Sequence, residues 1–119
     1  MPYVDGFLLP VPKKKIAEYR RMARKAGKIW IEHGALEFRE CAGDDLRHKG
    51  PVSFLKFVKA KPSETVFFSW IVFRSKAERN RVNKKVMNDR RIQKMMEPGE
   101  MPFDHTRMAY GGFKIAVDL

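Results

Sequence analysis

The chain has 119 residues and a net charge of +11, and 44% of its residues are hydrophobic. That length and apolar fraction predict one domain with its own core, spanning residues 1–119. The single cysteine, Cys41, excludes an internal disulfide and fits a reducing compartment. No apolar run reaches the roughly 18 residues of a membrane span, and the amino-terminal residues lack the charge order of a signal peptide. We therefore expect a cytoplasmic, soluble protein without a membrane partner.

The first two elements are predicted to be a strand and a long helix. Residues 3–11 form a short apolar run closed by prolines, which is typical of a strand. Apolar residues then recur at intervals of three and four, which predicts a helix over residues 13–33. This stripe comprises Ile16, Tyr19, Ala23, Ala26, Trp30 and His33. Gly34 is well placed as the carboxy-terminal cap of the helix.

Residues 35–42 predict a second strand, more exposed than the first. Leu36 and Phe38 fall on one of its faces, and Glu37, Arg39 and Cys41 fall on the other. A long connection follows over residues 44–63, with a small apolar cluster around Phe54.

The third strand, TVFFSWIVFR at residues 65–74, is apolar on both faces. With a period of two, Phe67 and Ile71 point one way, whereas Phe68 and Trp70 point the other. A strand with two apolar faces needs cover on both sides. Helices can cover one face, and a second copy of the chain is the expected cover of the other. The long connection before this strand is the alternative cover.

The remaining elements are a second helix and a last strand. Ser75 with Glu78 three residues later predicts a capping box for a helix that ends near residue 88, and residues 90–96 continue it as a turn or short helix. The segment MAYGGFKIAV at residues 108–117 predicts the fourth strand, whose double glycine indicates a bulge or a close backbone approach.

The resulting order, βαββαβ, is the ferredoxin-like arrangement. It belongs to the α+β class and has an antiparallel four-stranded sheet with two helices on one face. Two copies packed through their helix-free sheet faces would make a dimeric α/β barrel. A homodimer formed in this way is the expected assembly.

Four motifs resemble a known family. They are YVDGF near the start, HGALEF after the first helix, FSWIVFRS before the second, and MPFD…RM.YGGF near the end. In this order, and over essentially the whole chain, they resemble the YbaA-like small bacterial proteins of unknown function. The resemblance implies a ferredoxin-like, dimeric α/β-barrel fold and no established activity. That superfamily includes cofactor-free monooxygenases, haem-handling proteins and small-molecule regulators, and fold alone chooses among none of them.

His33 and Asp5 are the candidate catalytic residues. His33 ends the apolar stripe of the first helix, where the helix dipole favours a protonated ring, so it could act as a general acid or base. A histidine hydrogen-bonded to a loop is the alternative. Asp5 could be a base or an orienting group beside a histidine or arginine, or a structural ion-pair partner. Glu37 and Glu40 fall on opposite faces of their strand and do not form an acid–base pair.

A small organic ligand, held between sheet and helices, is the first functional hypothesis. The expected contacts are Trp70, Arg74, Arg107 and Tyr110. The tryptophan could line a cavity, and either arginine could clamp a carboxylate or phosphate. Intramolecular pairing of these arginines with Asp104 or Glu37 is the alternative. In its catalytic version the hypothesis combines Trp70 with the two candidate catalytic residues, and whether the chain is an enzyme is left open.

No cofactor or metal is expected. The three histidines, His33, His48 and His105, show no metal-ligand spacing with Cys41. The sequence has no glycine-rich phosphate loop, since the double glycine lies within a predicted strand.

The positive charge is concentrated in two predicted helical segments. Residues 13–28 carry eight basic residues against one acid, and residues 74–94 carry nine against two. The second hypothesis is therefore an accessory protein that binds nucleic acid, RNA in particular, through contacts with phosphate groups. The residues expected to make them are Arg20, Arg24, Lys28, Arg81, Lys84 and Lys85. A solubilising surface is favoured over this hypothesis, because the basic residues are spread around the helices.

Overall fold

The computed structural model describes residues 1–47, 50 and 52–119. His48, one of the three histidines considered above, lies outside the described residues. The elements are β1 (Tyr3–Pro12), η1 (Lys13–Lys15), α1 (Ile16–His33), β2 (Glu37–Ala42), α2 (Phe54–Phe57), β3 (Glu64–Phe73), α3 (Lys76–Met87), α4 (Arg90–Met95), η2 (His105–Arg107) and β4 (Ala109–Lys114).

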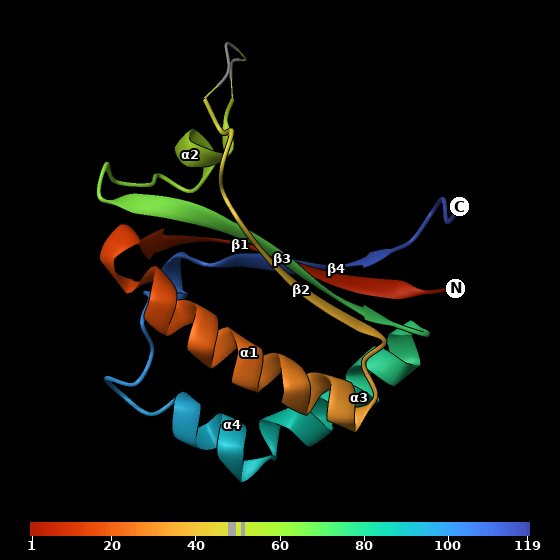
Figure 1. Cartoon of the computed structure of the whole chain (residues 1–119). Coiled ribbons are helices and arrows are strands. Elements are labelled where there is room, and N and C mark those ends of the chain that lie inside the picture. Colours follow the sequence, from red (N-terminus) through yellow and green to blue (C-terminus); the bar gives the residue numbers. More distant parts are fainter. Residues whose placement is uncertain (48–49, 51) are drawn as a thin grey trace.

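The four strands form one antiparallel sheet in the order β2-β3-β1-β4, so β1 and β3 are central. Helices α1, α3 and α4 cover one face, whereas the short α2 lies on the other side of the sheet (Figure 1). The predicted α+β class and ferredoxin-like alternation of strands and helices are confirmed. The sheet is open, with β2 at one edge and β4 at the other.

The two faces of β3 differ in what covers them. Phe67, Ile71 and Phe73 face the helices and are buried. Phe68 points to the other side of the sheet and is 46% exposed. The predicted apolar character of both faces is therefore confirmed. Part of the predicted alternative cover is also present, because the ring of Phe54 on α2 packs against Phe68 with centroids 6.3 Å apart.

The core between sheet and helices consists of two clusters. One contains Leu9, Val11, Tyr19, Ala23 and Phe67, and the other contains Ile29, Ala35, Ile71, Phe73, Val82, Val86 and Ile92. The apolar stripe predicted for α1 supplies residues to both clusters. Burial of this stripe, at about 1.5–3 kcal/mol for each large apolar side chain, is what holds α1 on the sheet.

Side-chain caps mark where α3 and α4 begin. The Ser75 hydroxyl accepts a hydrogen bond from the Glu78 amide at 3.1 Å, so the predicted N-cap of α3 is confirmed. The Glu78 carboxylate binds Arg81 in the described structure. Residue 90 starts a separate helix, α4, because Asp89 caps it by accepting from the Arg91 amide at 2.9 Å.

Gly27 lets α1 lie directly against β2. A Cβ atom at this position would lie 2.6 Å from the ring of Phe38. We expect Gly27→Ala to lower the free energy of unfolding by about 1–2 kcal/mol, because overpacking at about 1–3 kcal/mol outweighs the gain in helix propensity of about 1 kcal/mol. Urea unfolding measures the change in the free energy of unfolding. Ala17→Gly, at an exposed position of the same helix, is the control for the effect of helix propensity alone. A Gly27→Ala variant more stable than the parent chain would contradict the close approach.

Candidate functional site

A groove with a volume of about 860 Å³ lies between α1 and the edge strand β2. We call it the α1–β2 groove. Its lining consists of Ala17, Tyr19, Arg20, Arg21, Ala23, Arg24, Gly27, Lys28, Ile31, Phe38, Glu40, Ala42 and Phe67. Small residues on α1 and aromatic rings from the sheet make much of this surface, so the groove suits a ligand with a flat apolar body.

Tyr19 and Glu40 are the polar pair inside the α1–β2 groove. The Tyr19 hydroxyl donates to Glu40 Oε1 at 2.8 Å, and the Ser69 hydroxyl is a second donor to the same carboxylate. Burial raises the pKa of Glu40 above its usual range, although both hydrogen bonds act in the opposite direction. Burial, followed by the neighbouring Glu40 charge, also raises the pKa of Tyr19.

Glu40 differs from the other carboxylates that are at least partly buried in the described part of the chain. Each of the others has a cationic partner, and these carboxylates are Asp5, Glu37, Glu64, Glu78 and Asp89. The partners of Glu40 among the same described residues are two neutral hydroxyl groups, those of Tyr19 and Ser69. A half-buried carboxylate with neutral donors is the type of group that takes up a proton most easily.

Exposed cations line the same groove as this pair. Arg20, Arg24 and Lys28 follow one another at intervals of four on α1, and they line the α1–β2 groove together with Arg21. Within residues 1–47, 50 and 52–119 none of these four side chains has an ion-pair or hydrogen-bond partner. Three of the six predicted phosphate contacts thus lie together on one flank of α1.

The other three predicted phosphate contacts lie elsewhere. Arg81, Lys84 and Lys85 line a second hollow of about 620 Å³ with His33 and Asp89. His33 faces α3 and α4, on the opposite flank of α1 from the α1–β2 groove. The two basic groups therefore do not form one continuous strip.

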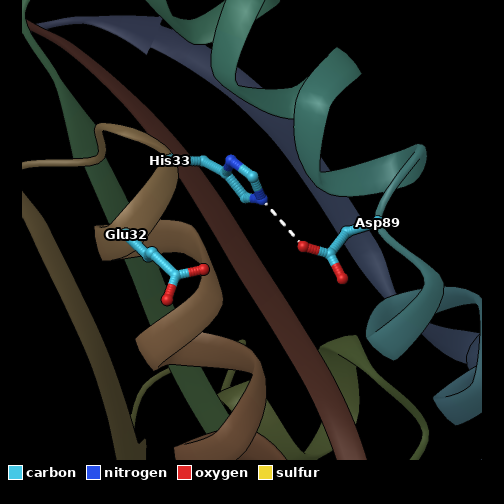
Figure 2. Close-up of side chains that lie close together, drawn as sticks. All are labelled: Glu32, His33 and Asp89. Atoms are coloured by element: carbon cyan, nitrogen blue, oxygen red, sulfur yellow. Dashed lines mark hydrogen bonds and ion pairs between the residues drawn. The ribbon is translucent and has the colours of Figure 1, made fainter.

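His33 pairs with Asp89, and Glu32 lies beside them (Figure 2). The His33 Nε2 atom is 2.8 Å from Asp89 Oδ2. One ligand atom from each of the three side chains lies within 4.8 Å of the others, a spacing that could hold a metal ion. However, the Arg91 guanidinium contacts both carboxylates and, with His33, lowers the pKa of Asp89. Arg91 thus supplies the positive charge there, and the cluster joins the end of α1 to the start of α4.

Asp5 is the centre of a separate buried network. Its carboxylate accepts from Arg79 Nε at 3.0 Å and from Asn83 Nδ2 at 3.2 Å. Arg79 also donates to the Tyr3 hydroxyl at 3.3 Å, and Trp30 Nε1 donates to Asn83 at 3.0 Å. Asp5 is therefore the structural ion-pair partner of an arginine on α3. It does not lie beside His33, whose partner is Asp89.

The structure separates Trp70 from Asp5. The indole faces the open side of the sheet, where it donates to Glu37 Oε1 at 3.2 Å, whereas Asp5 faces the helices. One pocket between sheet and helices therefore cannot contain both residues, which corrects the predicted combination. Tyr110 is 73% exposed at the opposite sheet edge, where it stacks on Phe7.

The predicted arginine clamps do not converge on one ligand site either. Arg107 donates to both carboxylate oxygens of Glu64, at 2.7 and 3.0 Å, and so does not pair with Asp104 or Glu37 as considered. Arg74 is exposed beyond the end of β3. Arg107 is thus occupied by a structural ion pair.

Sequence reasoning missed the role of Tyr19 and of Glu40. Tyr19 looked like one more member of an apolar stripe, and Glu40 was considered only with Glu37. The available signal was that Glu40 shares a strand face with Phe38, so a carboxylate had to point toward α1.

Comparisons with known proteins identify relatives of uncharacterised function. The model of a family described as "Protein of unknown function (DUF1428)" matches residues 2–105. The chain is 44% identical over 118 residues, and 99% of both chains, to "Uncharacterized protein YbaA" of Escherichia coli K12, and equally to that of Shigella flexneri. These relatives confirm the predicted resemblance to YbaA-like proteins.

Solved structures with a similar fold are more distant in sequence. An uncharacterised NIPSNAP domain protein from Burkholderia xenovorans aligns with a TM-score of 0.60 and 13% identity, covering 96% of this chain and 94% of its own. A NIPSNAP family protein from Agrobacterium tumefaciens gives a TM-score of 0.56 and 14% identity, covering 96% and 92%. At this identity the likeness concerns the fold alone. Among the described residues no helix is both long and apolar enough to cross a membrane.

Proposed function

The chain belongs to the DUF1428 family of proteins of unknown function, and we propose that it binds a small organic anion in the α1–β2 groove. The observation that carries this proposal is the set of four cations that line a hollow of about 860 Å³ and have no partner among the described residues. An apolar body would lie on Phe38 and the small residues of α1. A carboxylate or sulfonate group would bind the arginines, which suit such planar or multi-oxygen anions.

Phosphate contacts with a nucleic acid are the competing function. The interval of four residues between Arg20, Arg24 and Lys28 favours a row of anionic groups along α1. Two observations favour the small molecule instead. The groove is lined by Phe38 and small residues of α1, which suit an apolar body, and the second basic group lies on the other flank of α1.

The proposal includes a homodimer formed through the sheet face opposite α1, α3 and α4, which the short α2 covers in part. This face carries Phe68, Trp70 and Phe113 around the adjacent glycines Gly6 and Gly111, which pair with one another across β1 and β4. An almost entirely apolar hollow of about 660 Å³ lies there. Large exposed apolar patches of this kind mark interaction surfaces, and the two-fold packing of one sheet on another would cover it.

Naphthoate, a flat aromatic carboxylate, tests the proposed function. We expect it to bind the parent chain, and we expect the double variant Arg20→Gln/Arg24→Gln to bind at least ~10-fold more weakly, since a hydrogen bond to a charged group contributes about 1.5–3 kcal/mol. Isothermal titration calorimetry gives both affinities. Lys25→Gln removes a charge from the same helix outside the groove lining and should bind as the parent does.

Two results would count against this function. One is an affinity for naphthoate that the double variant leaves unchanged. The other is tight binding of a single-stranded oligonucleotide, with a log affinity that falls steeply and linearly with log salt, because that slope reports phosphate contacts.

A further inference from the structure

We propose that the ligand of the α1–β2 groove enters together with one proton, which Glu40 takes up so that its carboxyl group donates a hydrogen bond to the bound anion. This inference rests on the proposed function, because it concerns the same groove. Beyond that function, it names the group that changes its protonation state on binding, and it states that the affinity for the ligand depends on pH.

The first step of the argument is the position of Glu40. Its carboxylate lies in the α1–β2 groove with Tyr19 as donor at 2.8 Å and Ser69 as second donor. Both donors are neutral hydroxyl groups. A second negative charge brought into this groove would therefore meet a carboxylate that no ion pair neutralises. Two anionic groups that share a site retain one proton between them, because both cannot be ionised at close range.

The second step concerns the charged and polar groups that share the groove with Glu40. From α1 these are Arg20, Arg21, Arg24 and Lys28, all exposed. From β3 the facing polar group is Ser69, and the neighbours on the same face of β2 are Phe38 and Ala42, which do not titrate. The exposed cations can bind the anionic group of a ligand from the solvent side. The half-buried Glu40 lies deeper in the groove and meets the inner side of the same anionic group.

The third step is the change in protonation. A protonated carboxyl group has one O–H to donate and keeps acceptor capacity for Tyr19 and Ser69. Uptake of the proton therefore costs no existing hydrogen bond, and it adds one bond to the ligand. Burial already raises the pKa of Glu40 in the free protein, so protonating Glu40 costs less free energy than protonating an exposed glutamate.

The sign of the pH dependence follows by linkage. A bound anion raises the pKa of Glu40 further, so the complex holds more protons than the free protein at any pH between the two pKa values. Below the pKa of the free protein Glu40 is protonated in both states and affinity is greatest. Above it, affinity falls by up to ~10-fold per pH unit, until the pH exceeds the pKa of Glu40 in the complex.

Naphthalenesulfonate is the test ligand, because its sulfonate stays ionised and cannot take up the proton itself. Titration calorimetry in buffers of different ionisation enthalpy counts the protons taken up. For the parent chain we expect a count that rises toward one and an affinity that falls with pH. Glu40→Gln, which has the same shape and can still accept from Tyr19, should bind with no proton uptake and an affinity independent of pH.

The outcomes separate this inference from the proposed function. Binding by the parent chain with no proton uptake overturns the inference and leaves the function standing. Binding that Arg20→Gln/Arg24→Gln does not weaken, or no binding, overturns the function and the inference with it. The proton count of the parent chain does not depend on the folding of any variant. His33→Gln should still take up the proton on binding, because His33 lies on the other flank of α1. Uptake that disappears in His33→Gln would assign the proton to His33 and contradict the role of Glu40.

Discussion

Asp5→Ala is expected to lower the free energy of unfolding by about 3 kcal/mol. The substitution leaves the mostly buried Arg79 without the carboxylate that accepts from its Nε atom at 3.0 Å. Breaking one half of a buried ion pair costs about 3–5 kcal/mol. The lower end applies here because Arg79 keeps its bonds to Tyr3 and Asn80. Urea unfolding at one fixed protein concentration measures the loss.

Two further variants make this result specific to the pair. Asp118→Ala removes an exposed carboxylate near the end of the chain and should leave stability unchanged. In Asp5→Ala/Arg79→Ala the total loss should be smaller than the sum of the two single losses, because the charge left without its partner is gone. Additive losses would show that Asp5 and Arg79 do not act as a pair.

Phe68→Glu should convert the proposed homodimer into a monomer. The ring is 46% exposed at the centre of β3. It lies on the sheet face opposite α1, α3 and α4, which the proposal places against a second copy. A carboxylate introduced there would face an apolar partner surface without a cation, and burying such a charge costs several kcal/mol. Light scattering should give twice the chain mass of 13.9 kDa for the parent chain and one chain mass for the variant.

Leu36→Glu is the matched control for the assembly. Leu36 is 49% exposed, almost the same as Phe68, but it precedes β2 and is not part of the lining of the apolar hollow. This variant should stay dimeric. A parent chain that is monomeric at working concentration would refute the dimer, and loss of the dimer in both variants would show that charge alone, and not this face, decides assembly.

If the dimer forms in this way, it leaves the α1–β2 groove accessible. The groove lies on the side of the sheet that α1 covers, whereas Phe68 and Trp70 lie on the other side. Ligand affinity in Phe68→Glu should therefore stay close to that of the parent chain, and the assembly and binding experiments report on different parts of the molecule.

The amino-acid sequence by itself determined the elements and the direction in which their side chains point. The repeat of three and four residues from Ile16 to Trp30 predicts the buried stripe of α1, and the period of two in β3 predicts that Phe67 and Phe68 face opposite sides. The physical reason is that these patterns are local: they depend on backbone geometry and on the burial of apolar groups. The α+β fold, with an apolar sheet face left open, follows from them.

Only the tertiary structure decided which polar groups meet. Tyr19 and Glu40 are 21 residues apart in sequence, and Asp5 and Arg79 are 74 apart. A local period predicts toward which face a side chain points. It does not predict which element covers that face, or which residues of that element lie opposite the side chain. An ion pair or a hydrogen bond needs its partner atoms about 3 Å apart, and that distance is set by how helices pack on the sheet. The interval of four residues already places Arg20, Arg24 and Lys28 on one flank of α1, but only the packing of α1 against β2 brings Glu40 into the same groove.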